Sequence, residues 1–292
     1  MDSTLSSAIS SDVLQDAIMR DVRAALEEDV GSRDLTAELL PPSQQASATI
    51  ICREPATICG IPWVGRCFHA LDPAIEIRWK IAEGQQSQTD QALCEITGNA
   101  RALLTGERCA LNFLQSLSAT ATATKHYVEA IKGTHAYIYD TRKTLPGLRL
   151  AQKYAVTVGG GKNQRMGLHD GILIKENHIA AAGGIEQVLK AAGKLVAESG
   201  RIIPVQIEVE NLEQLQTALA SGASLILLDN FSLRELREAV KINQGRAILE
   251  ASGGIDLGNV RDVALTGVDR ISIGNLTKNL KAIDLSMRFK TT

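Results

Sequence analysis

Six predicted strands in the second half of the chain each end in ionisable or hydroxyl side chains. The strands are predicted at 135–140, 171–175, 205–210, 225–229, 246–251 and 270–273. The residues at their carboxyl ends read DTRKT (140–144), KENH (175–178), EVEN (208–211), DN (229–230), EASGG (250–254) and SIGN (272–275). Polar residues begin loops and cap helices in any protein, so one such end carries little information. Six in succession indicate a site at the edge where the parallel strands of an α/β barrel end.

Glu208 and Asp229 end consecutive predicted strands and are candidates for holding a divalent cation. Residues 205–210 alternate between apolar and polar types. Alternate side chains of a strand point to opposite faces, so Gln206, Glu208 and Glu210 are expected to face the barrel interior. A carboxylate there requires a cation or a proton to offset its lost hydration. Mg²⁺ binds a few carboxylates together with phosphate oxygens, which predicts a magnesium site at Glu208 and Asp229. A satisfied internal hydrogen-bond network is the alternative interpretation.

Basic residues concentrate between positions 140 and 175, where only two aspartates oppose them. The basic residues of this segment are Arg142, Lys143, Arg149, Lys153, Lys162, Arg165 and Lys175. Arg149 and Lys153 are four residues apart, a spacing that an exposed helix face also explains. The residues at 142, 143 and 175 stand instead at predicted strand ends. This placement favours a binding role for those three.

Glycines supply a second feature suited to anions. Residues 159–161 are three glycines, which would let backbone amides approach an anion, although three glycines more often form only a flexible turn. The last two predicted strands close with small residues, at the place where barrels commonly bind phosphate: Ser252, Gly253 and Gly254 on one, and Ser272, Gly274 and Asn275 on the other. Arginine suits planar carboxylates and lysine suits phosphates. The predicted ligand is therefore an anion with both phosphate and carboxylate groups, bound with a divalent metal.

The elements that carry these residues alternate regularly between strand and helix. Helical periodicity at 184–198, 212–221 and 233–243 separates the predicted strands, which indicates parallel strands joined by crossovers. The last three intervals are each about 20 residues, and this spacing favours a closed or nearly closed barrel over an open doubly wound sheet. The absence of GxGxxG after a strand lowers the case for a dinucleotide-binding fold. Residues 1–110 differ: helices at 12–29 and 101–118 flank short strands at 48–52, 75–81 and 93–96, which indicates a smaller α/β domain.

Composition excludes several classes of protein. The 292 residues carry a formal net charge of −2 and 3% aromatic residues, which argues against a nucleic-acid-binding surface. No apolar run approaches the length of a membrane span, and residues 1–20 have no apolar core of a secretion signal and contain three aspartates. The five cysteines, Cys52, Cys59, Cys67, Cys94 and Cys109, form no CxxC and are interpreted as buried thiols. We therefore expect a soluble cytoplasmic protein.

With these residues in place, the sequence resembles the quinolinate phosphoribosyltransferase family. The matching stretches occur in family order over about 28–290. They are EDVG (28–31) with Asp34 and Thr36, TGER (105–108), TRKT (141–144), residues 159–168, LIKENH (173–178), EVEN (208–211), LDN (228–230) and LTK (276–278). Each stretch is short, but TRKT, GGGxNxRxGL and LIKENH together are highly specific.

The resemblance implies a fold, a domain division and an assembly. The fold is an incomplete, seven-stranded α/β barrel with an N-terminal α/β sandwich domain. The sandwich domain is expected at 1–111, joined by the C-terminal tail 279–292, and the barrel at 112–278. The assembly is a homo-oligomer, dimer or hexamer, in which Arg108 enters the neighbouring site. Without the resemblance, Arg108 reads as an arginine that extends from the edge of a core helix.

The resemblance also assigns roles to the candidate residues. Arg108, Arg142, Arg165 and Lys175 would hold the two carboxylates of quinolinate, and Lys143 would reach phosphoribosyl pyrophosphate. Glu208 and Asp229 would engage the ribose hydroxyls and Mg²⁺. Residues 252, 253, 274 and 275 would hold phosphate, with Gly254 and Ser272 beside them. The expected reaction gives nicotinate mononucleotide, CO₂ and pyrophosphate, with Lys143, Lys175, Glu208 and Asp229 as the catalytic residues.

One position departs from the family pattern and leaves alternatives open. The family usually has histidine where this chain has Gln164, and glutamine can hydrogen-bond a carboxylate but carries no charge. A related phosphoribosyltransferase that acts on another pyridine carboxylate is therefore one alternative. A Schiff-base lyase that uses Lys175 as its nucleophile is a second. A metabolite-binding protein without catalytic activity is a third.

Overall fold

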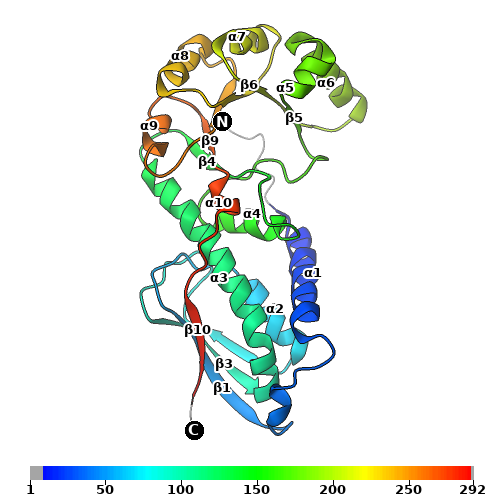
Figure 1. The fold of residues 1–292 in the computed structure, drawn as a ribbon, viewed down its shortest axis with the longest axis vertical. Coiled ribbons are helices and arrows are strands. Elements are labelled where there is room, and N and C mark those ends of the chain that lie inside the picture. The colour runs from blue at the N-terminus through cyan, green and yellow to red at the C-terminus, as the bar shows by residue number, and fades with distance from the viewer. Residues whose placement is uncertain (1–8, 291–292) are drawn as a thin grey trace. The chain divides into compact units, whose positions relative to one another are not determined.

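The computed structural model describes residues 9–290, which divide into two compact units. One unit contains residues 126–143 and 161–276. The other runs to residue 125 and adds 144–160 and the segment from 277 on. Figure 1 traces the elements of each unit. The division expected from the sequence lies elsewhere, at 111 and 278, and that boundary stays a prediction. Residues 1–8 and 291–292 of the expected sandwich domain lie outside the described residues.

One unit is built on a four-stranded antiparallel sheet. Its strands are β1 (Gln45–Cys52), β2 (Glu76–Trp79), β3 (Gln91–Asn99) and β10 (Leu285–Phe289), in the order β10-β1-β3-β2. Strand β10 comes from the end of the chain and pairs with β1, with Ile50 opposite Met287. The helices are α1 (Ser11–Val30), α2 (Ile61–Leu71), α4 (Arg149–Val158) and the first part of α3 (Ala100–Ala130), with a 3-10 turn at Ala37–Leu39. Buried Trp63, Phe68 and Leu114 belong to the core of this unit.

The five cysteines all belong to this unit, and all are free and buried. Burial raises the pKa of the Cys67 and Cys94 thiols to about 12. A thiol that does not ionise is a poor nucleophile and a poor metal ligand. The prediction of buried structural thiols is confirmed.

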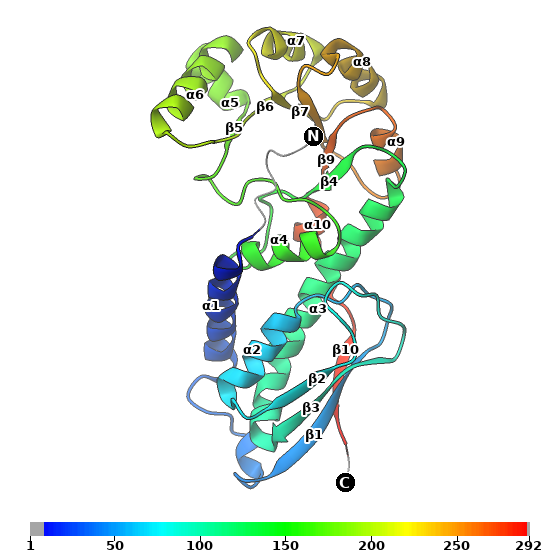
Figure 2. The same cartoon turned by 180° about the vertical axis from the view of Figure 1, so that it is seen from behind.

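The other unit is built on a six-stranded parallel sheet. Its strands are β4 (Tyr137–Tyr139), β5 (Ile172–Ile174), β6 (Val205–Val209), β7 (Leu225–Asp229), β8 (Ile248–Ser252) and β9 (Arg270–Ser272). Its helices are α5 (Glu176–Ala182), α6 (Ile185–Ser199), α7 (Leu212–Ala220), α8 (Leu233–Asn243), α9 (Val260–Ala264) and the start of α10 (Asn275–Lys278). Figure 2 shows α5 to α8 on one side of the strands.

The strand order of this sheet brings the two ends of its chain segment together. It runs β4-β9-β8-β7-β6-β5, so the first strand lies beside the last and the others follow chain order. A single parallel bridge joins Tyr139 to Lys162 on the free side of β4. The predicted α/β fold with a parallel sheet is confirmed. Where a seventh strand is expected, the described residues show this one bridge.

Local sequence explains where the helices begin. Ser232 caps α8 through its side chain, which accepts from the backbone N–H of Glu235, and the Glu235 carboxylate accepts in return from the N–H of Ser232. Asn211 caps α7 by accepting from the N–H of Gln214 over 2.9 Å. A helix start that follows a strand by a few residues fixes where that strand ends. The predicted site residues Glu208 and Asp229 each stand three positions before one of these caps.

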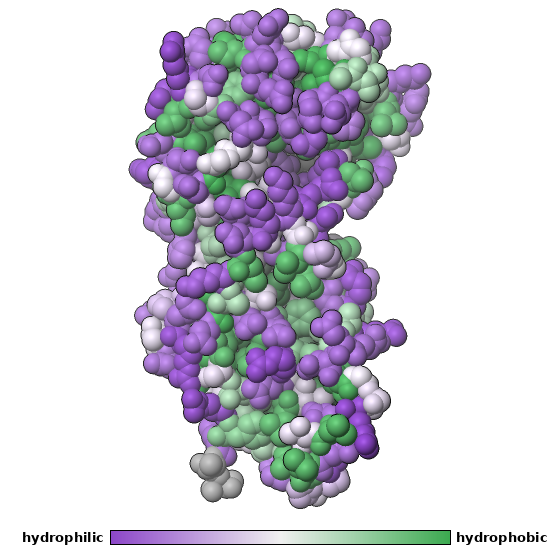
Figure 3. All heavy atoms as spheres, viewed as in Figure 1, coloured by the Kyte–Doolittle hydropathy of each residue, from purple (hydrophilic) through white to green (hydrophobic). Residues whose placement is uncertain are grey.

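Among the described residues, no helix is both long enough and apolar enough to cross a membrane. Exposed apolar side chains such as Leu39 and Ile202 do occur. On the face seen in Figure 3, hydrophobic residues are interspersed with hydrophilic ones. Scattered apolar residues of this kind are ordinary on protein surfaces.

Candidate active site

A cavity of about 260 Å³ opens in the unit with the parallel sheet. Its lining comes from five of the six strands, from the segment that follows β4 and from residues 164–165. The lining residues are Thr141, Arg142, Lys143, Gln164, Arg165, Leu173, Lys175, Gln206, Glu208, Leu227, Asp229, Glu250, Ser252 and Ser272. The carboxyl ends of the strands thus meet at one cavity, as expected for a barrel-type sheet.

The cavity brings together most of the residues predicted from sequence. Those that line it are Arg142, Lys143, Gln164, Arg165, Lys175, Glu208, Asp229, Ser252 and Ser272. Those that do not are Arg108, Gly253, Gly254, Gly274 and Asn275. Arg108 is exposed on α3 and belongs to the unit with the antiparallel sheet. Its role therefore stays a prediction.

Five lining residues were not predicted as site residues: Thr141, Leu173, Gln206, Leu227 and Glu250. A signal for four of them exists in the strand alternation. Each of the four precedes a predicted site residue by two positions, and positions i and i+2 of a strand face the same side. They are Leu173, Gln206, Leu227 and Glu250. The register places Leu227 opposite both Glu208 and Glu250, so these side chains share one face of the sheet.

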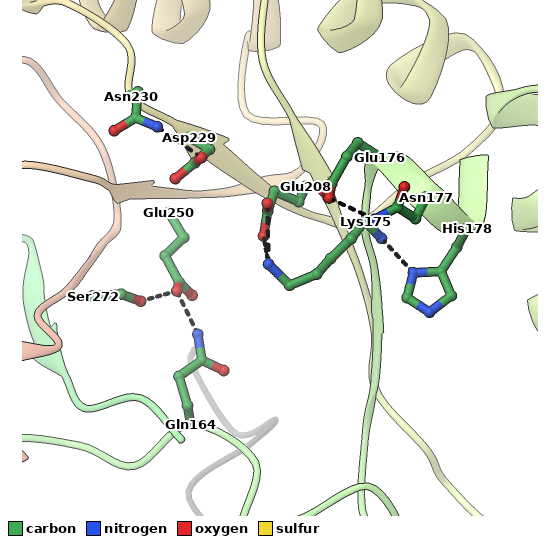
Figure 4. Close-up of polar contacts among 10 residues, drawn as sticks. All are labelled: Gln164, Lys175, Glu176, Asn177, His178, Glu208, Asp229, Asn230, Glu250 and Ser272. Atoms are coloured by element: carbon green, nitrogen blue, oxygen red, sulfur yellow. Dashed lines mark hydrogen bonds and ion pairs between the residues drawn. The ribbon is translucent and has the colours of Figure 1, made fainter. Parts of the chain in front are cut away.

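Lys175 and Glu208 form an ion pair at the mouth of the cavity. The Lys175 Nζ lies 2.8 Å and 3.2 Å from the two carboxylate oxygens of Glu208 (Figure 4). The Glu208 side chain is 11% exposed and that of Lys175 is 45% exposed. A carboxylate this buried is stabilised by a close cation, and the lysine remains accessible to an anionic ligand.

Two arginines form the basic side of the cavity. Burial lowers the pKa of the Arg165 guanidinium, and the like charge of Arg142 lowers it further, while Asp170 opposes both effects. The Nη1 group of Arg165 donates to the carbonyl oxygen of Gly171 over 2.8 Å, which fixes the side chain. Two neighbouring guanidinium groups repel each other and favour an anion between them, and planar carboxylates suit their fork geometry.

Asp229 is a carboxylate that a cation would stabilise. Burial raises its pKa, Glu210 and Glu176 raise it further, and Lys175 and Lys143 oppose them. Its Oδ2 accepts from Nδ2 of Asn230 over 2.9 Å (Figure 4). Glu208 and Asp229 are the two carboxylates at the mouth. Among the described residues no group of three or more histidine, cysteine or acidic side chains is gathered for a metal. A metal here would therefore rely on two protein carboxylates and on oxygens of the ligand.

Part of the KENH motif caps the N-terminus of helix α5. Lys175 is the N-cap of α5, and its backbone N–H donates to Nδ1 of His178 over 3.1 Å (Figure 4). Asn177 donates to Glu176 at the surface. The motif therefore anchors the backbone at residue 175 while the Lys175 side chain extends to Glu208.

The basic run between 142 and 175 also contains residues with a structural role. Lys153 lies on α4 and is fully buried. The interpretation of Arg149 and Lys153 as an exposed helix face is therefore wrong for Lys153. Sequence spacing alone does not distinguish a solvated lysine from one inserted in the interior.

Gly253 packs closely against Asn230, the residue that donates a hydrogen bond to Asp229. Its φ of +97° disfavours other residue types, and a Cβ there would lie 2.1 Å from Oδ1 and 2.9 Å from the backbone N of Asn230. Gly254 also has a positive φ (+60°), but a Cβ built there would meet no atom within 4 Å. Gly253 therefore maintains the geometry at Asp229 without lining the cavity.

We expect Gly253→Ala to displace Asn230 and with it Asp229. Catalytic efficiency should fall by about 10- to 100-fold, and the free energy of unfolding by about 1–3 kcal/mol. Gly222→Ala is the matched control, because Gly222 also has a positive φ (+81°), a built Cβ there would meet nothing within 4 Å, and the residue is not assigned to the site. Steady-state rates and thermal unfolding of both variants check this. Equal rates for the two variants would contradict a role of Gly253 at Asp229.

Comparison with known families covers nearly the whole chain. The family model described as quinolinate phosphoribosyl transferase, C-terminal domain, matches residues 120–288. The corresponding N-terminal domain model matches residues 34–118. All the residues that line the cavity fall within the first of these ranges, and Arg108 falls within the second.

Individual relatives agree over most of their lengths. A nicotinate-nucleotide pyrophosphorylase [carboxylating] of Mycobacterium leprae is 40% identical and covers 95% of this chain and 99% of its own. A probable nicotinate-nucleotide pyrophosphorylase [carboxylating] of Bacillus subtilis is 39% identical, with 89% of each chain covered. The solved structure of the nicotinate-nucleotide pyrophosphorylase from Francisella tularensis aligns with a TM-score of 0.89 at 44% identity, over 94% of this chain and 96% of that one.

Proposed function

The chain belongs to the quinolinate phosphoribosyltransferase family, and we propose that the cavity of the parallel sheet is where it carries out the family reaction. It transfers the phosphoribosyl group of phosphoribosyl pyrophosphate to quinolinate with decarboxylation. The products are nicotinate mononucleotide, CO₂ and pyrophosphate, so the enzyme serves de novo NAD biosynthesis. The relatives support this activity, and the assignment of individual residues is our proposal.

The separation of charge within one cavity is the observation that carries the residue roles. Arg142 and Arg165 lie on one side and favour an anion between them. Glu208 and Asp229 lie on adjacent strands of the other side. A dicarboxylate with an adjacent ribosyl cation in the transition state has the complementary pattern of charge. Lys175 also lines the cavity, where it is paired with Glu208 and accessible to a carboxylate.

The proposed chemistry follows from this arrangement. The pyridine nitrogen forms a bond to C1 of the ribose, and the bond from C1 to the pyrophosphate oxygen breaks with its electron pair leaving on pyrophosphate. Glu208 and Asp229 stabilise the positive charge that develops on the ribose, and Lys143 stabilises the departing charge. When the 2-carboxylate leaves as CO₂, its bonding electron pair stays on ring carbon 2, where the adjacent, now positively charged nitrogen stabilises it. A proton from water then binds that carbon.

The donor set fits a magnesium ion. Two carboxylates at one cavity mouth, one of them with a pKa raised by burial, provide the partial shell that Mg²⁺ takes from a protein when phosphates complete it. Glu208 and Asp229 would hold the ion. When bound, it would neutralise charge on the pyrophosphate leaving group.

Several finer features are proposals of the same kind. The incomplete seven-stranded barrel is supported by the strand order and by the bridge at Lys162. A homo-oligomer in which Arg108 enters the neighbouring site is supported by its exposure on α3. Gly274, Asn275 and the two glycines after Ser252 are proposed at the phosphate, since they follow the strands that end at the cavity. A cytoplasmic location also stays a prediction.

A product assay tests the proposed function. Purified protein with Mg²⁺, quinolinate and phosphoribosyl pyrophosphate should release CO₂ and pyrophosphate in equal amounts. Nicotinate and other pyridine carboxylates, run in parallel, test the alternative acceptor that Gln164 leaves open. The proposal would be overturned if folded protein released no pyrophosphate from phosphoribosyl pyrophosphate with any of these acceptors.

A further inference from the structure

The side chain of Asp170 closes a sharply bent segment, 166–170, that directly follows Arg165. One carboxylate oxygen of Asp170 accepts from the backbone N–H of Met166 over 2.6 Å, and the other accepts from the N–H of Gly167 over 2.8 Å. A carboxylate that receives two successive amides fixes the backbone between them. Asp170 therefore fixes the chain immediately beyond an arginine that lines the cavity.

The Arg165 side chain is held from the far end of the same segment. Its Nη1 group donates over 2.8 Å to the carbonyl oxygen of Gly171, the residue after Asp170. A Cβ built on Gly171 would lie 3.2 Å from Cβ and 3.5 Å from Cδ of Arg165, so the glycine makes room for the arginine. The bond to Gly171 uses one N–H of a guanidinium that has several, and the rest of the fork can meet a carboxylate.

Asp170 also places a negative charge beside Arg165. Burial lowers the pKa of the Arg165 guanidinium, the neighbouring Arg142 lowers it further, and Asp170 raises it. Burial raises the pKa of Asp170 itself, but its two backbone amides and nearby His169 outweigh that effect, so that the net pKa lies below its ordinary value. Asp170 is therefore an anion at neutral pH.

Two effects of Asp170 on an anionic ligand oppose each other. Asp170 does not line the cavity, and its charge repels a dicarboxylate there. Screened repulsion of this kind changes affinity by about 2- to 5-fold. Loss of the two backbone hydrogen bonds would let Arg165 move, and a shift of about 1 Å in a positioning group costs about 10-fold or more. The effect on Arg165 is therefore expected to dominate.

We propose that Asp170 is a positioning residue for Arg165. By holding the backbone N–H groups of Met166 and Gly167, it fixes the direction from which the guanidinium meets a carboxylate of quinolinate. The inference rests on the proposed function for the identity of the ligand. It adds to the site a residue outside the cavity lining, which acts through Arg165 and not on the substrate.

Equilibrium binding of quinolinate, measured by titration calorimetry, tests the inference without turnover. In Asp170→Asn the side chain keeps its shape, but its NH₂ group faces one of the two backbone N–H groups and that hydrogen bond is lost. Quinolinate should bind about 10-fold more weakly, and binding of phosphoribosyl pyrophosphate with Mg²⁺ should be unchanged. Glu83→Gln is the matched control, because Glu83 accepts from two successive backbone N–H groups, of Gly60 and Ile61, in the other unit. It should leave the affinity for quinolinate unchanged.

A double-mutant cycle separates positioning from general damage to the fold. In an Arg165→Ala background, Asp170→Asn should weaken quinolinate binding no further, because the residue that it positions is gone. An additive loss in that background would show that Asp170 does not act through Arg165, and it would overturn the inference. Tighter binding in Asp170→Asn alone would also overturn it, since that is the result expected when only the repelling charge matters.

Gly171→Ala reaches the same arginine from the other end of the segment, so it provides a test if Asp170→Asn fails to fold. Its Cβ would press on Cβ of Arg165 and leave the hydrogen bonds of Asp170 in place. Quinolinate binding should weaken by about 3- to 10-fold, and an unchanged affinity would overturn the inference. Wild-type turnover with unchanged quinolinate affinity in Asp170→Asn contradicts the inference alone. Wild-type protein that binds quinolinate and releases no pyrophosphate contradicts the proposed function alone.

Discussion

We expect that replacing Lys175 with alanine lowers kcat/KM by roughly 10²- to 10³-fold, while the protein remains folded. The variant loses a cation that lies 2.8 Å from Glu208 and is accessible to an anionic substrate. It also leaves a nearly buried carboxylate without this partner at the mouth of the cavity, where Glu208 would then repel a dicarboxylate. Both effects weaken binding of quinolinate and of the transition state. Steady-state kinetics with each substrate varied in turn measures the loss.

Two further variants separate these effects. Lys194→Ala is the matched control, because Lys194 pairs with Glu198 at the surface of α6 and is 78% exposed; it should retain normal rates. Lys175→Ala combined with Glu208→Gln removes the unpaired carboxylate. Quinolinate affinity should then recover in part, whereas kcat should not, because Glu208 is proposed to act on the ribose. Near-normal rates in Lys175→Ala would reject the role of the lysine.

The parallel sheet was predictable because its pattern is local. Strands β6 and β7 are each followed within a few residues by a helix-capping residue, Asn211 and Ser232 respectively. The order of the strands was predictable from chain connectivity, since parallel crossovers place successive strands side by side. The closing contact between β4 and β9 joins residues more than a hundred positions apart, and no local pattern encodes it.

The helices of the antiparallel unit were harder to predict. The helix expected at 101–118 continues in the structure as α3 to Ala130. Beyond residue 118 its buried face carries small side chains such as Ala121 and Thr124 in place of leucine. A pattern based on large apolar residues therefore stops too early. Helix α2 was missed, since Pro62 and Gly65 resemble turn residues. In the structure Pro62 occupies the first turn, where proline is tolerated.

Some residues of the candidate site could likewise be identified from the sequence, and others could not. Arg142, Lys175 and Asp229 stand at strand ends and were identified by residue type and position. Glu250 was visible at a strand end but not chosen, because its value lies in three partners from other segments. Sequence reasoning finds a residue that reacts with a ligand more readily than one that positions its neighbours. The register of adjacent strands supplies the missing information.

Arg108 provides the second large expected effect, through the assembly. If it enters the site of a neighbouring subunit, Arg108→Ala should lower kcat/KM by roughly 10²-fold or more, as for other charged contacts to a bound carboxylate. The fold should be unaffected, because Arg108 is exposed on α3. The loss should appear mainly in the KM for quinolinate. Normal kinetics in this variant would remove Arg108 from the site.

Mixing two inactive variants distinguishes a residue supplied by the neighbour from one supplied by the same subunit. In a twofold-symmetric dimer of Arg108→Ala with Lys175→Ala, one site lacks both residues and the other lacks neither. Random subunit exchange therefore restores about a quarter of the wild-type sites. Arg142→Ala mixed with Lys175→Ala is the matched control, because both residues line the same cavity of one subunit and every site then lacks one of them. Activity that returns in the first mixture and not in the second would establish a shared site. If subunits labelled with two dyes exchange and neither mixture recovers activity, Arg108 acts within its own chain or not at all.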